Sequence, residues 1–282
     1  MNKNIIRTST LAVALLSLVS CSDDIDGHKE DVTLSPSFCY YFNPQSGQKV
    51  IMPPSTTRLT IDSRGKADAE IINFRRYPGS APETITLPNL PWIASINGVT
   101  CIDKRDPQEP ENQVHIERYM AYYADRRVDN KPAPISYTVA YLDDMTYIAT
   151  FPAEEYAFGK TVTREATGGT EENENLEMYY HFTFDTQNMT VDMTMEKAFF
   201  GFGMPFPMTL TVPSIPLTLS AQGFSAELAS VIPVSGGVPY PRFEIKDLKI
   251  EIPFIDNGSI SFTCAGKWDV KAQVSTVPGK IR

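Results

Sequence analysis

The sequence predicts an all-β protein in which two tandem, related antiparallel β-barrel or β-sandwich modules follow a lipoprotein signal peptide. Three observations predict this fold class: a composition of 22 Pro, 15 Phe and 13 Tyr, runs in which apolar and polar residues alternate, and an internal repeat. Aromatic residues favour strands, and prolines interrupt long helices. A chain of 282 residues is long enough for one or two domains.

The first twenty residues have the composition of a secretory signal peptide. Lys3 and Arg7 precede apolar residues 11–19, a run shorter than the roughly 20 residues that cross a bilayer. The tetrapeptide LVSC that ends at Cys21 resembles the lipobox of bacterial lipoproteins. We therefore predict that residues 1–20 are removed and that Cys21 carries a lipid. The alternative is an ordinary signal peptide followed by a chance cysteine.

Residues 21–35 are predicted to form a lipidated acidic tether. Ser22, Asp23 and Asp24 follow Cys21 directly, and this order resembles the export signal of surface lipoproteins of the Bacteroidetes. The resemblance implies a lipid-anchored protein of the outer membrane that is displayed at the cell surface. Its N-terminal lipid would be its contact with the membrane. The alternative is a solvated tether on a protein that stays in the periplasm.

The charge and the cysteine pattern restrict the partners. The formal net charge is −9, whereas proteins that bind nucleic acid present a basic surface, so nucleic acid is not an expected partner. Besides Cys21 the chain contains Cys39, Cys101 and Cys264, so at most one disulfide can form, and we expect small buried side chains. No CxxC pair is present and the histidines stand apart, so we expect no metal and no cofactor.

An internal repeat supports the two related modules. Two segments of twenty residues align without gaps and are identical at seven positions, and shorter matches on either side occur in the same order. A tandem duplication explains this collinear order, and convergent strand patterning is the alternative. The aligned blocks are residues 59–62 with 182–185, 82–101 with 207–226, and 153–163 with 265–275.

The repeat and a polar stretch between its copies define the predicted domains. The acidic segment EENENLE has few apolar groups and is typical of a solvated linker. The two copies of the last block lie closer together in the sequence than the two copies of the middle block. This difference implies thirteen extra residues in copy one, within residues 103–134. The predicted boundaries are 36–164 for β module 1, 165–175 for the linker and 176–278 for β module 2.

Alternation of apolar and polar residues predicts strands with one buried face. The segment 256–259 contains Asn-Gly and predicts a tight reversal. Prolines also occur inside strand-like runs, where the missing N–H excludes the middle of a sheet, so we expect edge or sharply bent strands there. The predicted strands are 179–184, 190–195, 243–246 and 248–252, and the prolines are Pro88, Pro91, Pro213 and Pro216.

The order of features in each copy resembles the calycin-like β-barrel lipoproteins of the Bacteroidetes. The matching pieces are INF at 72–74 with PETITL at 82–87, and EKAF at 196–199 with MPFP at 204–207. The resemblance implies an antiparallel barrel or flattened barrel that can hold an apolar ligand. It implies no catalytic residue.

The loops that follow Phe74 and Phe199 contain the candidate binding residues. In copy two the loop offers aromatic and sulfur-containing side chains, which we interpret as a lid over a bound lipid or over the face of a bound sugar. The alternative is that these side chains fill the core. In copy one the loop offers cations that could grip a carboxylate or sulfate; the alternative is solvated charges at a strand end. The candidates are Phe200, Phe202, Met204 and Phe206, and Arg75, Arg76 and Tyr77.

No catalytic motif is present, and the protein is predicted not to be an enzyme. Glu154 and Glu155 are neighbours, but neighbours on a strand point to opposite faces. We expect a noncatalytic surface lipoprotein that binds a small apolar or amphipathic ligand. The alternative is a structural or adhesive module that recognises a glycan or a protein through exposed aromatic side chains, among them Tyr119, Tyr122 and Tyr123.

Overall fold

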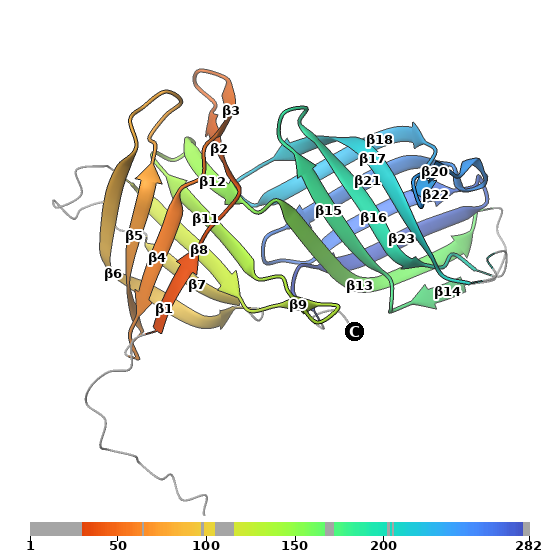
Figure 1. The fold of residues 1–282 in the computed structure, drawn as a ribbon, viewed down its shortest axis with the longest axis horizontal. Helices are drawn as coiled ribbons and strands as arrows, with labels where there is room; N and C mark the ends of the chain where they lie inside the picture. Colours follow the sequence, from red (N-terminus) through yellow and green to blue (C-terminus); the bar gives the residue numbers. More distant parts are fainter. Residues whose placement is uncertain are drawn as a thin grey trace, which may run out of the picture.

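The computed structural model describes residues 30–63, 65–96, 99–104, 116–166, 172–201, 204 and 206–278. Apart from a short 3-10 helix, η1 (Pro241–Phe243), the regular structure of these residues is β, which confirms the predicted class. Two parts lie side by side along the long axis, a curved sheet from the N-terminal half and a barrel from the C-terminal half (Figure 1). The predicted lipidation and export residues, Cys21, Ser22, Asp23 and Asp24, lie outside the described residues.

The C-terminal part is an antiparallel sheet that closes on itself. Two short strands, β19 (Val234–Ser235) and β20 (Val238–Pro239), form a hairpin beside it, and β14 (Glu172–Asn175) pairs with its first strand. The remaining strands are β13 (Glu154–Glu165), β15 (Tyr179–Asp185), β16 (Thr190–Ala198), β17 (Met208–Leu219), β18 (Gly223–Val231), β21 (Ile245–Pro253), β22 (Gly258–Cys264) and β23 (Trp268–Ser275).

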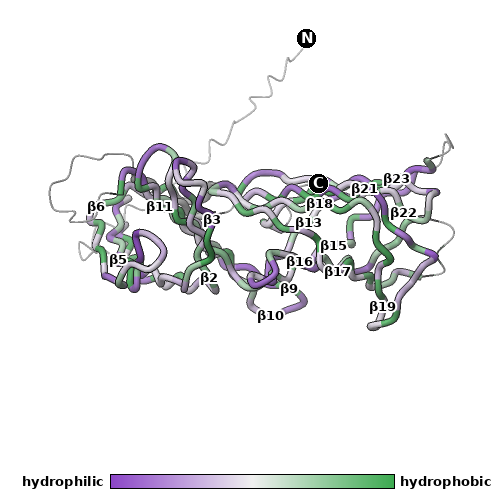
Figure 2. Tube along the Cα trace, turned by 90° about the horizontal axis from the view of Figure 1, so that it is seen from above, coloured by the Kyte–Doolittle hydropathy of each residue, from purple (hydrophilic) through white to green (hydrophobic). Residues whose placement is uncertain are grey.

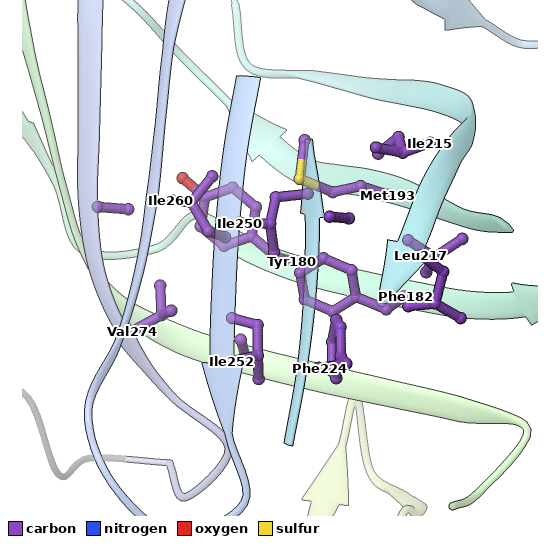
Figure 3. Packing of buried hydrophobic residues seen from close by; sticks show 14 of the residues in the cluster. Tyr180, Phe182, Met193, Ile215, Leu217, Phe224, Ile250, Ile252, Ile260 and Val274 are labelled. Carbon is purple, nitrogen blue, oxygen red and sulfur yellow. The ribbon is translucent and has the colours of Figure 1, made fainter. Parts of the chain in front are cut away.

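The pairing of β16 with β17 closes the barrel, because the order β16-β15-β13-β23-β22-β21-β18-β17 is already hydrogen-bonded between neighbours. Alternate residues on each strand point inward, such as Val191, Met193 and Met195 on β16. Figure 3 shows side chains of this core, among them Tyr180 and Phe182, packed against one another. The alternation predicted for residues 179–184 and 190–195 is therefore confirmed.

The N-terminal part is one open sheet of ten strands. A separate two-stranded hairpin, β9 (Arg127–Val128) and β10 (Lys131–Pro132), lies at the junction with the barrel (Figure 2). In spatial order the sheet contains β1 (Glu30–Leu34), β4 (Thr56–Ile61), β5 (Lys66–Phe74), β6 (Glu83–Ile96), β7 (Val99–Lys104), β8 (Arg118–Ala124), β11 (Ile135–Tyr141), β12 (Tyr147–Phe151), β2 (Phe38–Asn43) and β3 (Gln48–Met52).

Strands β2, β8, β11 and β12 are buried on both faces. On β2, Phe38 and Tyr40 join the core that continues into the barrel, whereas Cys39 and Tyr41 join the core of the N-terminal sheet. Strands buried on both faces carry continuous apolar runs rather than an alternating pattern. The run FCYYF on β2 therefore reflects the position of the strand between two cores.

Aromatic rings form the contact between sheet and barrel. The ring of Phe254, at the end of β21, stacks on Tyr137 with centroids 4.1 Å apart and lies 5.3 Å from Phe151. Phe38 stacks on Phe151 at 5.4 Å and meets the edge of Phe184 of the barrel at 6.0 Å. Because such rings bury large apolar surfaces, the contact holds the two parts together.

The two parts repeat one strand order. The neighbours β4-β5-β6-β7-β8-β11-β12 of the sheet correspond to β15-β16-β17-β18-β21-β22-β23 of the barrel. The aligned blocks 59–62 and 182–185 fall on the corresponding strands β4 and β15. The blocks 82–101 and 207–226 begin on the corresponding strands β6 and β17. Two of the three predicted blocks therefore agree with the topology.

The third block was aligned wrongly. Residues 153–163 lie in β13, the first strand of the barrel, whereas residues 265–275 lie in β23, its last strand. β13 pairs with β15 and β23, although the predicted boundary assigns it to module 1. β14 lies within the predicted linker, residues 165–175, and also pairs with β13. The thirteen-residue insertion in copy one was inferred from the position of this block, so the structure does not support it.

Two of the four prolines inside strand-like runs, Pro88 and Pro213, mark bends as predicted, whereas Pro91 and Pro216 pair in register with Lys66 and Thr190. Next to Pro88, Asn89 has φ +56°, and its N–H donates to Asp68 Oδ1 on β5 at 2.9 Å. Next to Pro213, Ser214 has φ +54°, and its N–H donates to Asp192 Oδ1 on β16 at 2.7 Å. The strand register shifts at both places, so β6 and β17 carry the same kind of bulge.

Other local predictions were also tested. The chain reverses between β21 and β22, as predicted for residues 256–259, but neither Asn257 nor Gly258 has a positive φ, and Gly258 is the first residue of β22. Cys39 and Cys264 are buried and free, and burial raises the pKa of Cys264 to about 12. The side chain of Cys101 lies outside the described residues. The two described cysteines therefore behave as small core side chains, as expected.

Candidate functional site

The predicted lid residues are placed differently from one another. Phe200 and Met204 are buried, and the N–H of Phe200 donates to Met204 Sδ at 3.1 Å. Phe200 also meets Phe262 edge to face, with centroids 5.8 Å apart. Phe206 is 62% exposed, and Phe202 lies outside the described residues. Phe200 and Met204 therefore occupy the core, which is the alternative that the sequence left open.

The cationic loop of the first sheet pairs within itself. Arg75 donates to the carbonyl of Ser80. Arg76 donates through Nε and Nη2 to the two carboxylate oxygens of Glu83, at 2.7 and 3.2 Å, which raises the pKa of Arg76. Tyr77 is 56% exposed. The two guanidinium groups thus have separate protein partners and do not converge on one ligand position.

The expectation of exposed tyrosines in copy one is wrong for two of the three residues. Tyr119 and Tyr122 lie on β8 and are buried, and Tyr123 is half-buried. Tyr119 shares a hydrogen bond of 3.0 Å with Thr57 Oγ1 inside the sheet core. These rings are therefore part of the packing rather than of an adhesive surface.

A cleft forms where the β9–β10 hairpin of the N-terminal part lies against the outer face of the barrel. We call it the hairpin cleft; its volume is about 400 Å³, within the range of small-molecule sites. One wall belongs to the hairpin and the segment after it, and the other belongs to β13, β15 and β16. The cleft is lined by Val128, Asp129, Lys131, Pro132 and Ala133 and by Glu154, Tyr156, Tyr179, His181 and Glu196.

A buried ion pair holds the hairpin in place. Arg126 Nη1 donates to Glu155 Oε1 at 2.6 Å and to the carbonyl of Thr276 at 2.8 Å, and Nε donates to the carbonyl of Ala133 at 2.7 Å. The side chains of Arg126 and Glu155 are only 3% and 1% exposed. Burial raises the pKa of Glu155, and the Arg126 guanidinium opposes that shift. The wall of the cleft is thereby tied to the first and last strands of the barrel.

Strand register stacks the rings that line the cleft. Tyr156 on β13 pairs with His181 on β15, and their rings stack at 4.5 Å. Phe158 pairs with Tyr179 in the same way, with centroids 5.7 Å apart. Arg126 covers Tyr156 with its Cζ 5.4 Å from the ring centroid. The rings of Tyr156, Tyr179 and His181 line the cleft, and each is stacked on a ring of the neighbouring strand.

Each carboxylate of the cleft has a fixed donor. Tyr179 donates to Asp129 Oδ2 at 2.7 Å, and Tyr156 donates to Glu154 Oε2 at 3.2 Å. His181 Nε2 lies 3.0 Å from the same Glu154 oxygen. Burial raises the pKa of Tyr179, and Asp129 raises it further, so the hydroxyl stays protonated. The oxygens that remain can accept hydrogen bonds from a ligand.

The third carboxylate lies across the barrel surface from the hairpin. Thr209 Oγ1 donates to Glu196 Oε2 at 2.7 Å. The cleft therefore contains three acidic side chains against Lys131 and His181. Among the described residues no group of three or more His, Cys, Asp or Glu is arranged to hold a metal ion. The surface is suited to a ligand that donates hydrogen bonds.

The sequence offered only a weak indication of this site. Glu154 faces the cleft and Glu155 the interior, so the predicted opposite orientation of these neighbours is confirmed. Alternation on strands 154–158 and 179–181 places Tyr156, Tyr179 and His181 on the outer face with Glu154. The hairpin that completes the cleft comes from the other part of the chain, which no local pattern predicts.

Within the described ranges no helix is long and apolar enough to cross a membrane. No protein-family model matches the chain, and no curated protein matches it. Among solved structures it is similar to a "putative outer membrane protein" from Bacteroides fragilis NCTC 9343. The identity is 10% and the TM-score 0.31, over 86% of this chain and 95% of that chain.

Proposed function

We propose that the protein is a noncatalytic, lipid-anchored surface protein that binds a glycan in the hairpin cleft. The observation that carries the proposal is the convergence of three carboxylates, Asp129, Glu154 and Glu196, on one cleft between two parts of the chain. Carboxylates accept hydrogen bonds from hydroxyl groups. A neutral glycan offers several hydroxyl donors close together and carries no charge that the cleft would repel.

An apolar ligand inside the barrel has less support. Packed side chains occupy the barrel core, and two of the residues expected to form a lid, Phe200 and Met204, belong to that core. The hairpin cleft is polar and has an excess of acidic groups, so a fatty acid or another anionic amphiphile would meet charge repulsion. We therefore favour the glycan over the apolar ligand.

The proposed role is binding rather than catalysis. Glycoside hydrolysis uses one protonated carboxyl group as an acid and a second carboxylate as base or nucleophile. In the cleft, hydroxyl groups donate to Glu154, Glu196 and Asp129, so each of the three already accepts a hydrogen bond from the protein. This favours stable hydrogen bonds to a ligand.

The cellular location rests on the N-terminal sequence. We propose that Cys21 is lipidated and that the acidic residues after it direct the protein to the surface of the outer membrane. The mass of the N-terminal peptide from membranes tests lipidation, and Cys21→Ser is expected to prevent membrane attachment. Protease treatment of whole cells tests surface display.

We also propose that the two parts arose by duplication of one calycin-like module. The repeated strand order and the paired bulges at Asn89 and Ser214 support this origin. Two of the three blocks of sequence similarity fall on corresponding strands. In the N-terminal copy the sheet stays open, and the barrel covers the second face of β2, β8, β11 and β12.

The direct test of the glycan proposal is a glycan array with the mature protein in detergent, followed by calorimetry on the glycans that bind. Glu196→Gln is expected to weaken binding about tenfold, because a hydrogen bond to a charged group contributes about 1.5–3 kcal/mol. Glu196 is not in the buried ion pair, so the fold should be unaffected.

The matched control is Glu70→Gln on β5, an exposed carboxylate that pairs with Arg58 away from the cleft. Its affinity should equal that of the unmodified protein. An array without any binding glycan, or an equal loss of affinity in both variants, would contradict the proposal. Shortened products in the reaction mixture would assign catalysis instead.

A further inference from the structure

A second cavity lies on the outer face of the barrel, near its junction with the sheet. We call it the polar groove; its volume is about 460 Å³, and it shares no lining residue with the hairpin cleft. Ser225 on β18 pairs with Glu251 on β21. Glu251 pairs with Ser259 on β22, and Ser259 pairs with Gln273 on β23. Four polar side chains therefore stand in one row across four strands.

Two glycines keep the floor of the polar groove free of side chains. A Cβ atom on Gly223 would lie 2.2 Å from the carbonyl oxygen of Ile252, and one on Gly258 would lie 2.4 Å from that of Glu251. Neither position can carry a side chain at these distances. β18 and β22 thus approach β21 closely, and the floor is backbone between polar walls.

The described residues that line the polar groove are almost uncharged, with Glu251 as their single charged side chain. Within the described part of the chain, the side chains of Gln222, Ser225, Ser259 and Gln273 make no hydrogen bond to the protein. Amide and hydroxyl groups both donate and accept. The groove therefore offers a row of groups that matches a ligand with many hydroxyls.

The polar groove continues toward the N-terminal sheet. A neighbouring cavity of about 230 Å³ shares Gln222 and Pro253 with it and adds Tyr141. Tyr141 is half-buried, and the guanidinium of Arg118 lies 5.7 Å from the centre of its ring. Tyrosine combines an apolar ring with a polar edge, which suits the mixed surface of a sugar.

We propose that the polar groove is a second binding site, for a neutral linear oligosaccharide that lies across β18, β21, β22 and β23. Neighbouring strands are about 4.8 Å apart, and one hexose unit of an extended chain advances by a similar length. Each strand of the row then meets one sugar unit. The site goes beyond the hairpin cleft, because it lacks the cluster of carboxylates and lies on other strands.

The test is calorimetric titration of the mature protein in detergent with maltohexaose, cellohexaose, mannohexaose and laminarihexaose. One of these is expected to bind, and Gln273→Ala should weaken it about tenfold through the lost amide contacts. Ser259→Trp places a ring in the groove and should abolish binding. Unchanged thermal unfolding of both exposed-site variants verifies that they are folded.

One control variant distinguishes binding in the polar groove from binding elsewhere on the protein. Gln48→Ala removes a comparable exposed amide on β3 and should leave affinity unchanged. The proposal is overturned if no hexaose binds, or if Gln273→Ala and Ser259→Trp bind normally. A loss of hexaose affinity in Glu196→Gln, with normal affinity in both groove variants, also overturns it, since the sugar then occupies the hairpin cleft.

Discussion

Arg126 connects three distant segments through one guanidinium. It contacts Ala133 between β10 and β11, Glu155 on β13, and Thr276 just after β23. Its ring partner, Tyr156, also lines the hairpin cleft. The same side chain therefore joins the sheet to the barrel and positions one wall of the candidate site. Sequence alone could not predict this, because the partners lie up to 150 positions apart.

Arg126→Met is expected to lower the free energy of unfolding by about 3–5 kcal/mol, because it leaves the buried Glu155 carboxylate without its cation. Urea denaturation followed by fluorescence measures the change. Arg126→Met combined with Glu155→Leu should recover part of the loss, since the remaining buried charge is then removed.

The control for this prediction is Arg58→Met, which breaks the pair with Glu70. Those two side chains are 64% and 42% exposed, so the expected change is about 0–1 kcal/mol. An Arg126→Met protein as stable as the Arg58→Met protein would show that the buried pair does not stabilise the junction.

How well the strands could be predicted depends on how many of their faces are buried. β15 and β16 have one face in the barrel core, and their alternation was sufficient to predict them. β8 lies between two cores, and its sequence RYMAYYA fits no single period. The assignment of β13 failed for another reason: similarity to β23 reflects a common strand pattern, whereas membership of a sheet depends on long-range pairing.

The bulges of β6 and β17 lead to a prediction for the neighbouring strands. Asp68→Ala and Asp192→Ala should each lower the free energy of unfolding by about 1 kcal/mol, because each carboxylate accepts the N–H of a bulge residue. Asp144→Ala, in the exposed turn between β11 and β12, is the control and should have little effect. Equal stability of all three variants in urea would mean that the bulges hold without these bonds.

The described residues form two apolar cores, and the larger one crosses the junction. It includes Phe38, Tyr137 and Phe151 of the sheet together with Phe182, Phe224 and Phe254 of the barrel. Separation of the parts would expose these rings to water. The hydrophobic contribution of the junction therefore couples the stability of both parts.

We expect one cooperative thermal transition, with equal calorimetric and van't Hoff enthalpies. Phe254→Ala should lower the stability of the whole molecule by about 3–5 kcal/mol, because Phe254 stacks on Tyr137 and packs near Phe151. Phe42→Ala, on the half-buried end of β2, is the control and should cost less. Two resolved transitions in scanning calorimetry would contradict the coupling.

The junction also imposes an order on folding during biosynthesis, since a chain is made from its N-terminus. The N-terminal sheet is complete when β12 ends at Phe151, but the barrel closes only when β23, which ends at Ser275, pairs with β13. Until then, the aromatic face of the N-terminal sheet does not yet pack against a complete barrel. We therefore expect that a chain truncated before β23 would leave apolar surface of both parts exposed and would aggregate.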